Sequence, residues 1–213
     1  MRELGPYLVA NTASCTPHTT LDVIAQAVAG GIQWVQLRAK EETAREFYEL
    51  AIAAAELTEG KAELLINDRI DVYLAARAAG AAVTGIHIGQ KDLPVRVART
   101  LIGEGIIGLS ASSDDQLAQA ARDAQAIDYL GVGAIRATPT KKDHPTPIGI
   151  DGFLRAAGRV DLPCVAIGAL TAQDASALRQ GGAAGMAVVR AICAAQSPET
   201  ATRELVDVWE SAR

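Results

Sequence analysis

The chain lacks the features that mark nucleic-acid-binding, membrane and secreted proteins. Its formal net charge is −5 and its longest basic run is Lys141-Lys142, whereas a nucleic-acid binder normally has a basic stripe. No segment approaches the ~18 consecutive apolar residues that a membrane span needs. The first residues, Met1 to Pro6, contain no signal-peptide apolar stretch. We therefore expect a cytoplasmic protein that binds neither nucleic acid nor membranes.

Cysteine is also scarce, and its pattern excludes further kinds of site. The three cysteines, Cys15, Cys164 and Cys193, are odd in number and lack metal-type spacing. We expect buried free thiols in a reducing compartment. No Ser/His/Asp or Cys/His arrangement for covalent catalysis is evident, and His87, within an apolar run, is interpreted as a structural histidine.

Short apolar runs alternate with segments of helical periodicity along the whole chain. The runs are continuous rather than alternately apolar and polar, which is typical of parallel strands buried on both faces. We expect strands at 6–10, 34–37, 64–66, 85–88, 106–109, 129–132, 164–167 and 186–189. We expect helices at 20–29, 43–57, 70–79 and 151–158, and others beginning near Pro94, Ser113, Thr171 and Ser197.

This alternation predicts a single (β/α)8 barrel domain over residues 1–213. A doubly wound open sheet has the same local pattern, but it would concentrate polar motifs near one switch point. Here polar residues follow seven of the runs, from the second to the last. In a (β/α)8 barrel the active site lies at the C-terminal ends of the strands, where all these residues would meet.

Three donors lie at the end of the second predicted strand and directly after it. Alternate residues of an extended segment face the same way, so Gln36, Arg38 and Lys40 would point together. Convergent donors of this kind suit a diphosphate. The alternative is a rim of ion pairs with Glu41 and Glu42.

Two carboxylates follow the next two strands. Asp68 and Asp92 would lie on neighbouring strands, where both could approach one ion. Magnesium typically takes one or two carboxylates together with water and substrate phosphates. The alternative for Asp68 is an N-cap of the following helix.

Further phosphate-binding groups follow the last three strands. The long loop at 133–148 contains Thr138, Thr140 and Lys141, and a loop of this length is usually a lid or a binding loop. Barrels also frequently bind phosphate after the last two strands, here at Gly168-Ala169 and Arg190. Small residues at such positions can equally serve packing.

Six segments, in order along nearly the whole chain, resemble the thiamine phosphate synthase family. They are VQLRAK (35–40), INDRID (66–71), GIHIGQKDLP (85–94), GLS (108–110), DYLGVG (128–133) and TPTKKD (138–143). The resemblance implies a Mg²⁺-dependent transferase that joins 4-amino-2-methyl-5-hydroxymethylpyrimidine diphosphate to a thiazole phosphate. The products are thiamine phosphate and diphosphate, and the reaction is implied to be dissociative.

The resemblance also implies roles for matching residues. The pyrimidine diphosphate is expected to contact Gln36, Arg38, Lys40, Asn67, Ser110 and Lys141, of which Arg38, Lys40, Ser110 and Lys141 are the expected catalytic groups. Asp68 and Asp92 are expected to bind the metal. The thiazole phosphate is expected to contact Thr138, Thr140, Gly168, Ala169, Val189 and Arg190.

Three departures from the family pattern stand out. Ala169 replaces a second glycine, and a positive φ there would strain alanine, so the phosphate site is expected to survive if φ stays negative. Arg190 replaces a serine and is expected to contact the thiazole phosphate. Its alternative is to pair with an acid of the last helix. The segment at 78–84 is longer than usual, which is expected to lengthen a turn far from the site.

Two other functions fit the same barrel. A thiazole tautomerase, a related isomerase, typically lacks the metal aspartates and the loop lysine, and its characteristic histidine would stand where this chain has Ser112. A non-catalytic protein that binds thiamine intermediates would lack a metal pair. The sequence leaves the oligomeric state open, a homo-oligomer included.

Overall fold

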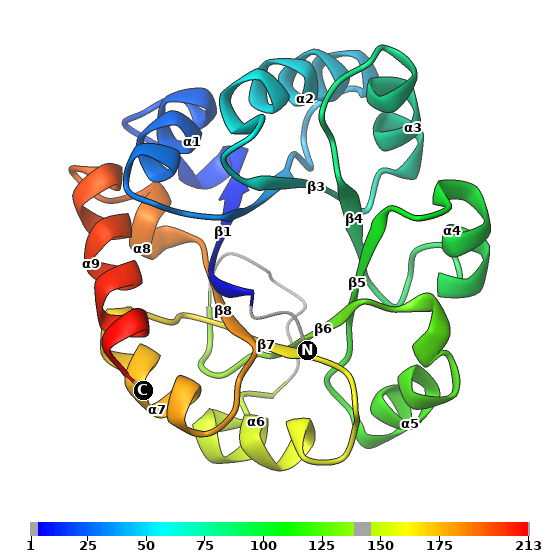
Figure 1. Ribbon diagram of the computed structural model, residues 1–213, viewed down its shortest axis with the longest axis vertical. Coiled ribbons are helices and arrows are strands. Elements are labelled where there is room, and N and C mark those ends of the chain that lie inside the picture. Colours follow the sequence, from blue (N-terminus) through cyan, green and yellow to red (C-terminus); the bar gives the residue numbers. More distant parts are fainter. Residues whose placement is uncertain (1–3, 139–145, 213) are drawn as a thin grey trace.

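Eight parallel strands close into a barrel in the computed structural model, which describes residues 4–138 and 146–212 (Figure 1). The strands are β1 (Gly5–Asn11), β2 (Trp34–Arg38), β3 (Glu63–Asn67), β4 (Gly85–Ile88), β5 (Ile106–Ser110), β6 (Tyr129–Gly133), β7 (Cys164–Ile167) and β8 (Gly185–Val188). Each strand pairs with the next, and β1 pairs in parallel with β8. The predicted (β/α)8 barrel is confirmed, and the open-sheet alternative is wrong.

The helices lie outside this barrel (Figure 1). They are α1 (Thr20–Ala29), α2 (Ala44–Thr58), α3 (Ile70–Ala78), α4 (Val95–Ile102), α5 (Asp114–Arg122), α6 (Gly149–Ala157), α7 (Ala175–Gln180), α8 (Arg190–Cys193) and α9 (Pro198–Ser211). Short 3₁₀ turns are η1 (Thr12–Ser14), η2 (Ala124–Ala126) and η3 (Ala172–Asp174). Capping residues fix several starts; Thr43, for example, accepts from the amide of Glu46, whose side chain accepts in return. Within the described ranges, no helix combines the length and apolarity needed to cross a membrane.

The observed boundaries differ from the expected ones mainly after the last two strands. Thr171 opens a 3₁₀ turn before α7 begins. β8 ends at Val188 rather than Val189, because Val189 leaves the extended region with φ −113° and ψ −83°. The chain then enters the short helix α8, which the sequence did not predict.

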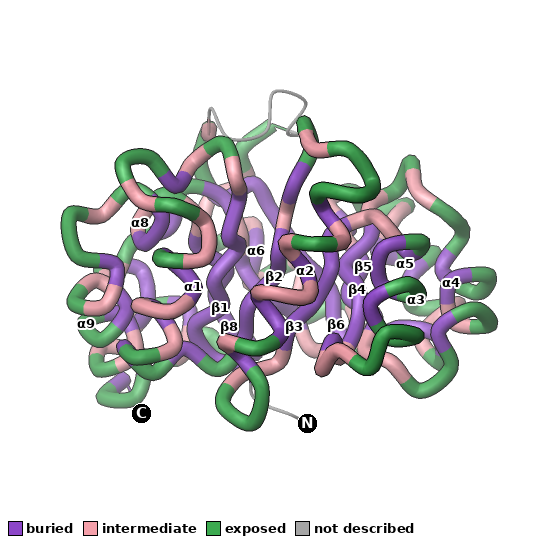
Figure 2. The backbone as a smooth tube through the Cα atoms, turned by 90° about the horizontal axis from the view of Figure 1, so that it is seen from above, coloured by how far each residue is buried: buried purple, intermediate pink, exposed green. Residues whose placement is uncertain are grey.

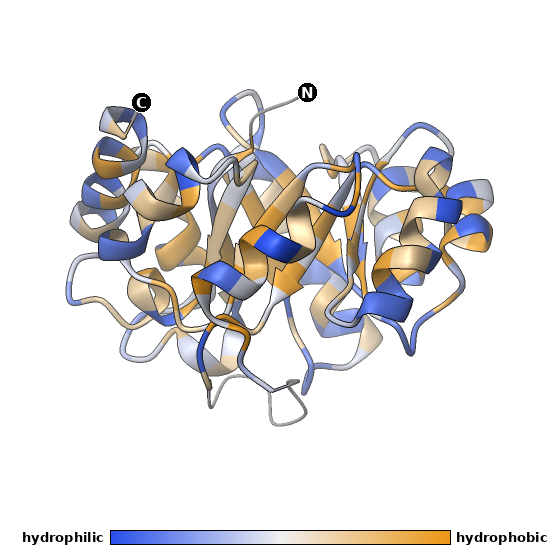
Figure 3. Cartoon of the chain, turned by 90° about the horizontal axis from the view of Figure 1, so that it is seen from below, coloured by the Kyte–Doolittle hydropathy of each residue, from blue (hydrophilic) through white to orange (hydrophobic). Residues whose placement is uncertain are grey.

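Alternate residues of each strand pack on opposite sides of the barrel wall. On β1, Tyr7 and Val9 lie in the barrel interior with Trp34, whereas Leu8 packs in the larger core between strands and helices. The strands accordingly form a buried apolar centre, and the exposed and hydrophilic residues occur mainly on the surrounding helices and loops (Figures 2 and 3). The same alternation, continued to the strand ends, decides which side chains reach the mouth of the barrel.

The longer segment at 78–84 lies at the opposite end of the barrel, as expected. It links α3 to the first residue of β4, and its last residue, Thr84, donates its amide to the Leu64 carbonyl. The extra residues are therefore remote from the C-terminal ends of the strands.

Candidate active site

A continuous chain of hydrogen bonds crosses the barrel interior and joins two predicted ligands of the pyrimidine diphosphate. The Gln36 amide donates to the Tyr7 hydroxyl at 2.7 Å, and the Tyr7 and Tyr129 hydroxyls lie 2.7 Å apart. His87 Nδ1 lies 2.8 Å from the Tyr129 hydroxyl, and His87 Nε2 lies 2.9 Å from Ser110 Oγ. His87 is buried and both its ring nitrogens have hydrogen-bond partners, as a structural histidine requires.

The donors and acceptors in this series of hydrogen bonds can be assigned, because each hydroxyl carries a single hydrogen. With the Gln36 amide nitrogen toward Tyr7, the Tyr7 hydrogen has the Tyr129 oxygen as its acceptor. Tyr129 then donates to His87 Nδ1, and His87 Nε2–H donates to Ser110. Burial raises the pKa of both Tyr7 and Tyr129, so both phenols stay neutral. The Ser110 hydrogen is left to donate outward, which suits an anionic ligand.

Gly108 provides the space for this chain. A Cβ at Gly108 would lie 2.2 Å from Tyr129 Cζ and 2.4 Å from His87 Nδ1. Any side chain there would separate the two rings, so a glycine in the middle of β5 is required by packing rather than by backbone conformation.

Two cationic side chains lie at the C-terminal end of β2. Arg38 Nη1 donates to Asn11 Oδ1 at 2.7 Å, and Asn11 in turn donates to Ser14 Oγ at 2.6 Å. Lys40, two residues beyond the strand, forms an ion pair with Asp68. The ion-pair alternative for the sequence pattern is wrong, because within the described chain neither cation pairs with Glu41 or Glu42.

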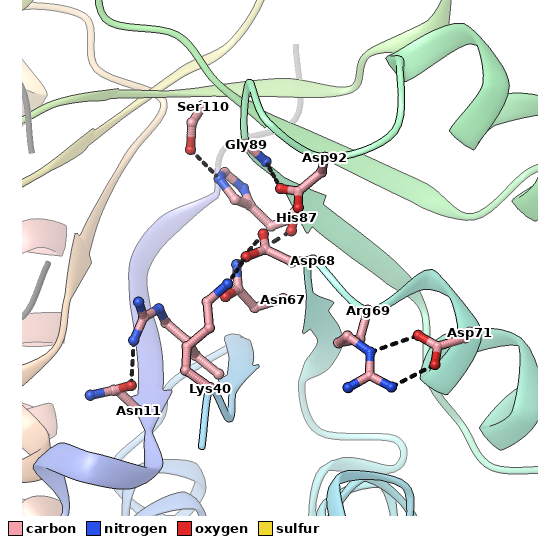
Figure 4. Close-up of polar contacts among 11 residues, drawn as sticks. Asn11, Lys40, Asn67, Asp68, Arg69, Asp71, His87, Gly89, Asp92 and Ser110 are labelled. Carbon is pink, nitrogen blue, oxygen red and sulfur yellow. Dashed lines mark hydrogen bonds and ion pairs between the residues drawn. The ribbon is translucent and has the colours of Figure 1, made fainter. Parts of the chain in front are cut away.

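The Asp68 and Asp92 carboxylates point toward each other beside Lys40 (Figure 4). Asn67 donates to Asp68 Oδ1 at 3.0 Å, and the Gly89 amide donates to Asp92 Oδ2 at 2.7 Å. Burial raises the pKa of Asp92, and the neighbouring Asp68 charge raises it further. Lys40 offsets part of this repulsion, and a further cation between the two carboxylates would stabilise the ionised pair.

Asp68 is not the N-cap of α3. That position belongs to Arg69, and no side chain caps the helix start. Asp68 instead has a left-handed backbone with φ of 60°, and its amide donates to the His87 carbonyl. This turn aims the carboxylate at Asp92 rather than at the helix.

The carboxylate pair fits a hard divalent metal. The described residues contain no group of three or more His, Cys, Asp or Glu side chains placed to hold a metal. A metal here would therefore complete its coordination with substrate oxygens and water, as magnesium commonly does. The observation that supports this fit is that the Asp68 and Asp92 carboxylates face each other at the end of the barrel, with a raised Asp92 pKa in agreement.

The ends of β7 and β8 lie side by side, since Ile167 pairs with Ala187. Gly168 has φ of 123° and Ala169 has φ of 49°, so Ala169 does not keep the negative φ that the sequence-based expectation required. A left-handed conformation costs an alanine about 1 to 2 kcal/mol. Something else in the structure must therefore hold the turn.

Arg190 begins α8 and is exposed. The alternative that it pairs with an acid of α9 is wrong, because among the residues that the structure describes its side chain forms no ion pair. It stays beside Val189 at the end of β8, where the phosphate site is predicted.

Not every predicted residue can be placed. Thr138 is half-buried after β6, whereas Thr140 and Lys141 lie outside the described residues. Sequence reasoning also missed residues of the site: Asn11 at the end of β1, and Tyr7 and Tyr129 in the interior chain. Asn11 carried a signal, as a polar residue directly after an apolar strand; the tyrosines did not differ from ordinary core residues.

A closed barrel with cations, a carboxylate pair and glycine turns at one rim is typical of barrel enzymes that act on phosphorylated substrates. The family model described as thiamine monophosphate synthase matches residues 6–192. The chain is 44% identical over 187 residues to a thiamine-phosphate synthase of Corynebacterium efficiens, covering 87% of each chain. It is 42% identical over 206 residues to that of Vibrio parahaemolyticus, covering 96% of this chain and 97% of the relative.

A solved structure agrees with these relatives. The thiamine phosphate pyrophosphorylase of Pyrococcus furiosus superimposes with a TM-score of 0.85 at 29% identity, covering 99% of this chain and 98% of that one. The chain belongs to the thiamine monophosphate synthase family. It is a transferase that forms thiamine phosphate from a pyrimidine diphosphate and a thiazole phosphate, and the tautomerase and non-catalytic alternatives are not supported.

The interior hydrogen-bond chain leads to a test by deleting one hydroxyl. Tyr129→Phe should leave the Tyr7 hydrogen and His87 Nδ1 without partners in the core. We expect the free energy of unfolding, measured with urea, to fall by about 1 to 3 kcal/mol. Tyr73→Phe is the matched control, because the Tyr73 hydroxyl has no hydrogen bond to another described residue. Equal stability of the two variants would contradict the hydrogen-bond network through Tyr7, Tyr129 and His87.

Proposed function

We propose that the pyrimidine diphosphate binds at the rim formed by the ends of β2 to β5, together with Mg²⁺. The observation that carries this proposal is the Asp68–Asp92 carboxylate pair beside Lys40. A diphosphate brings negative charge that Arg38 and Lys40 can share. The metal would balance the negative charge of the two carboxylates, and the diphosphate would balance the positive charge of Arg38 and Lys40.

The chain's own residues have distinct parts in the proposed reaction. Asp68 and Asp92 would hold the metal, which when bound supplies Lewis-acid stabilisation of the departing diphosphate. Arg38 and Lys40 would neutralise charge that accumulates on the diphosphate as the carbon–oxygen bond breaks. Ser110, oriented by His87, would donate a hydrogen bond to the same group.

The proposed order of events is dissociative. The carbon–oxygen bond to the diphosphate breaks first, leaving positive charge on the pyrimidine methylene carbon. The lone pair of the thiazole nitrogen then forms the new carbon–nitrogen bond. No residue needs to remove a proton in these steps. Tyr7 and Tyr129 in the barrel interior have raised pKa values and stay neutral, so neither would act as a base.

The thiazole phosphate is proposed to bind at the ends of β6 to β8. The turn at Gly168-Ala169 and the start of α8 at Val189-Arg190 lie next to each other there, with Thr138 following β6. Thr140 would join this site, and Lys141 would contact the diphosphate.

A cytoplasmic location is proposed because Cys15, Cys164 and Cys193 are all free and buried, which fits a reducing compartment.

The metal pair can be tested with isosteric substitutions. Asp68→Asn and Asp92→Asn should each lower kcat on the order of a hundredfold, because a ligand that offsets the leaving-group charge is lost. Asparagine tolerates the positive φ of Asp68, so the fold should be retained. Asp71→Asn is the control, since Asp71 pairs with Arg69 away from the site (Figure 4).

Removal of the metal is the complementary measurement. We expect excess chelator to abolish turnover and added Mg²⁺ to restore it. Full turnover in chelator, or loss of activity in Asp71→Asn equal to that in Asp92→Asn, would contradict the metal proposal.

Arg38 is expected to act through its forked guanidinium. Arg38→Lys should weaken diphosphate binding, measured by calorimetry, by about tenfold, since a point charge cannot reproduce a bidentate contact. Arg69→Lys is the same change outside the site and should leave the affinity unaltered. Lys141→Ala should weaken diphosphate binding as well. Unchanged affinity in both Arg38→Lys and Lys141→Ala would show that neither residue binds the diphosphate.

Arg190 is expected to contact the thiazole phosphate. Arg190→Ser should raise the KM for the thiazole phosphate about tenfold and leave the KM for the pyrimidine diphosphate nearly unchanged, because only one substrate loses a charged contact. Arg203→Ser, on α9, removes an arginine that pairs with Glu199 and serves as control. Equal effects on both substrates would show that Arg190 is not a phosphate ligand.

A further inference from the structure

Arg136 binds the strained turn after β7 with both its side chain and its backbone. Its Nη1 donates to the Ala169 carbonyl at 3.3 Å, and its amide donates to the Gly168 carbonyl at 3.2 Å. One residue earlier, the Ile135 amide donates to the Ile167 carbonyl at 2.9 Å. The segment after β6 therefore runs alongside the turn and contacts each of its residues in order.

The guanidinium of Arg136 also binds the far side of the same turn. Nη1 and Nη2 donate to the two oxygens of Asp174 at 2.9 and 2.6 Å. Asp174 is buried, with 5% of its surface exposed, and it accepts from the Thr171 amide at 2.9 Å. Arg136 is thus connected to the turn at Ala169 directly and at Thr171 through Asp174.

These contacts explain how alanine can occupy a position with φ of 49°. Ala169 is exposed, so packing of its side chain does not hold it there. Gly168 lies close against the segment after β6, and a Cβ there would be 2.6 Å from the Ile135 nitrogen, so position 168 has no space for a side chain. The Arg136 hydrogen bonds to the carbonyls of Gly168 and Ala169 are the contacts that fix the orientation of the two peptide groups.

We propose that Arg136 is a positioning residue for the thiazole phosphate: it holds the Gly168–Ala169 turn in its left-handed conformation without touching the phosphate. The proposal rests on the thiazole-phosphate site proposed above. Three of the five N–H groups of the Arg136 guanidinium bind Asp174 and Ala169, so its main contacts are with the turn and with the residue that holds it. A glycine at position 169 would adopt this conformation without help, so the need for Arg136 depends on the alanine.

A double-mutant cycle tests this dependence. Arg136→Ala should raise the KM for the thiazole phosphate about tenfold while changing the KM for the pyrimidine diphosphate by less than about twofold. Ala169→Gly alone should keep the parent KM. In the double variant Arg136→Ala/Ala169→Gly, the thiazole-phosphate KM should return to within about threefold of the parent value. A double variant as impaired as Arg136→Ala would overturn the proposal, because the guanidinium would then act on the phosphate itself.

Two further variants control for charge and folding. Arg155→Ala removes another arginine from the same cavity of ≈ 410 Å³ without touching the turn, and it should leave both KM values unchanged. Arg136→Lys keeps a positive charge beside buried Asp174, so it remains measurable if Arg136→Ala does not fold. Its smaller rise in thiazole-phosphate KM should also disappear with Ala169→Gly. An equal rise in Arg155→Ala, or no rescue of Arg136→Lys, would overturn the proposal.

Unfolding measurements separate this proposal from the proposed function. The loss of stability caused by Arg136→Ala should be smaller with glycine at position 169 than with alanine, whatever the turn binds. Equal losses would overturn the coupling even if Arg190→Ser confirms the phosphate site. If the coupling is found but neither Arg136→Ala nor Arg190→Ser changes the thiazole-phosphate KM, the proposed site is wrong, and the positioning role is overturned with it.

Discussion

Closure of eight parallel strands is the constraint on which the rest of the structure depends. Because every strand runs in the same direction, their carboxyl ends meet at one rim, and residues far apart in sequence become neighbours there. Strand alternation then selects which side chains enter the interior. Gln36 and His87 point inward for the same reason that Tyr7 and Trp34 do, and a shift of one residue in any strand would reverse the selection.

Polar groups inside the barrel are tolerated because they satisfy one another. Gln36, Tyr7, Tyr129, His87 and Ser110 form one connected chain, and an interruption would leave a buried donor or acceptor without a partner. The chain also links the apolar interior to the polar rim. Packing and site geometry are therefore coupled: Gly108 serves the site only by leaving space for two rings.

The charged groups at the rim form two regions of different composition. Around β2 to β4, two carboxylates face each other beside a lysine, an arrangement that favours a bound cation and an anionic substrate together. Around β6 to β8, backbone turns and arginines predominate. The negative charge of Asp174 is balanced by Arg136, whose hydrogen bonds lower the pKa of the Asp174 carboxyl. In the proposed function, the first region would bind the diphosphate of one substrate and the second region the single phosphate of the other.

By itself the sequence determined the strand order, the type of barrel and most residues of the rim, because apolar runs, caps and the polar residues that follow each strand are local signals. It indicated Asp68 and Asp92 as partners, since neighbouring strands of a barrel must end close together. Only the tertiary structure decided that Asp68 turns away from its helix, that Ala169 has positive φ, and that α8 follows Val189. Tyr129 and Arg136 were invisible in the sequence, because their roles depend on partners 42 residues away at His87 and 38 residues away at Asp174. Contacts between residues so far apart in the sequence form only when the strands pack side by side in the barrel, and no local sequence pattern predicts them.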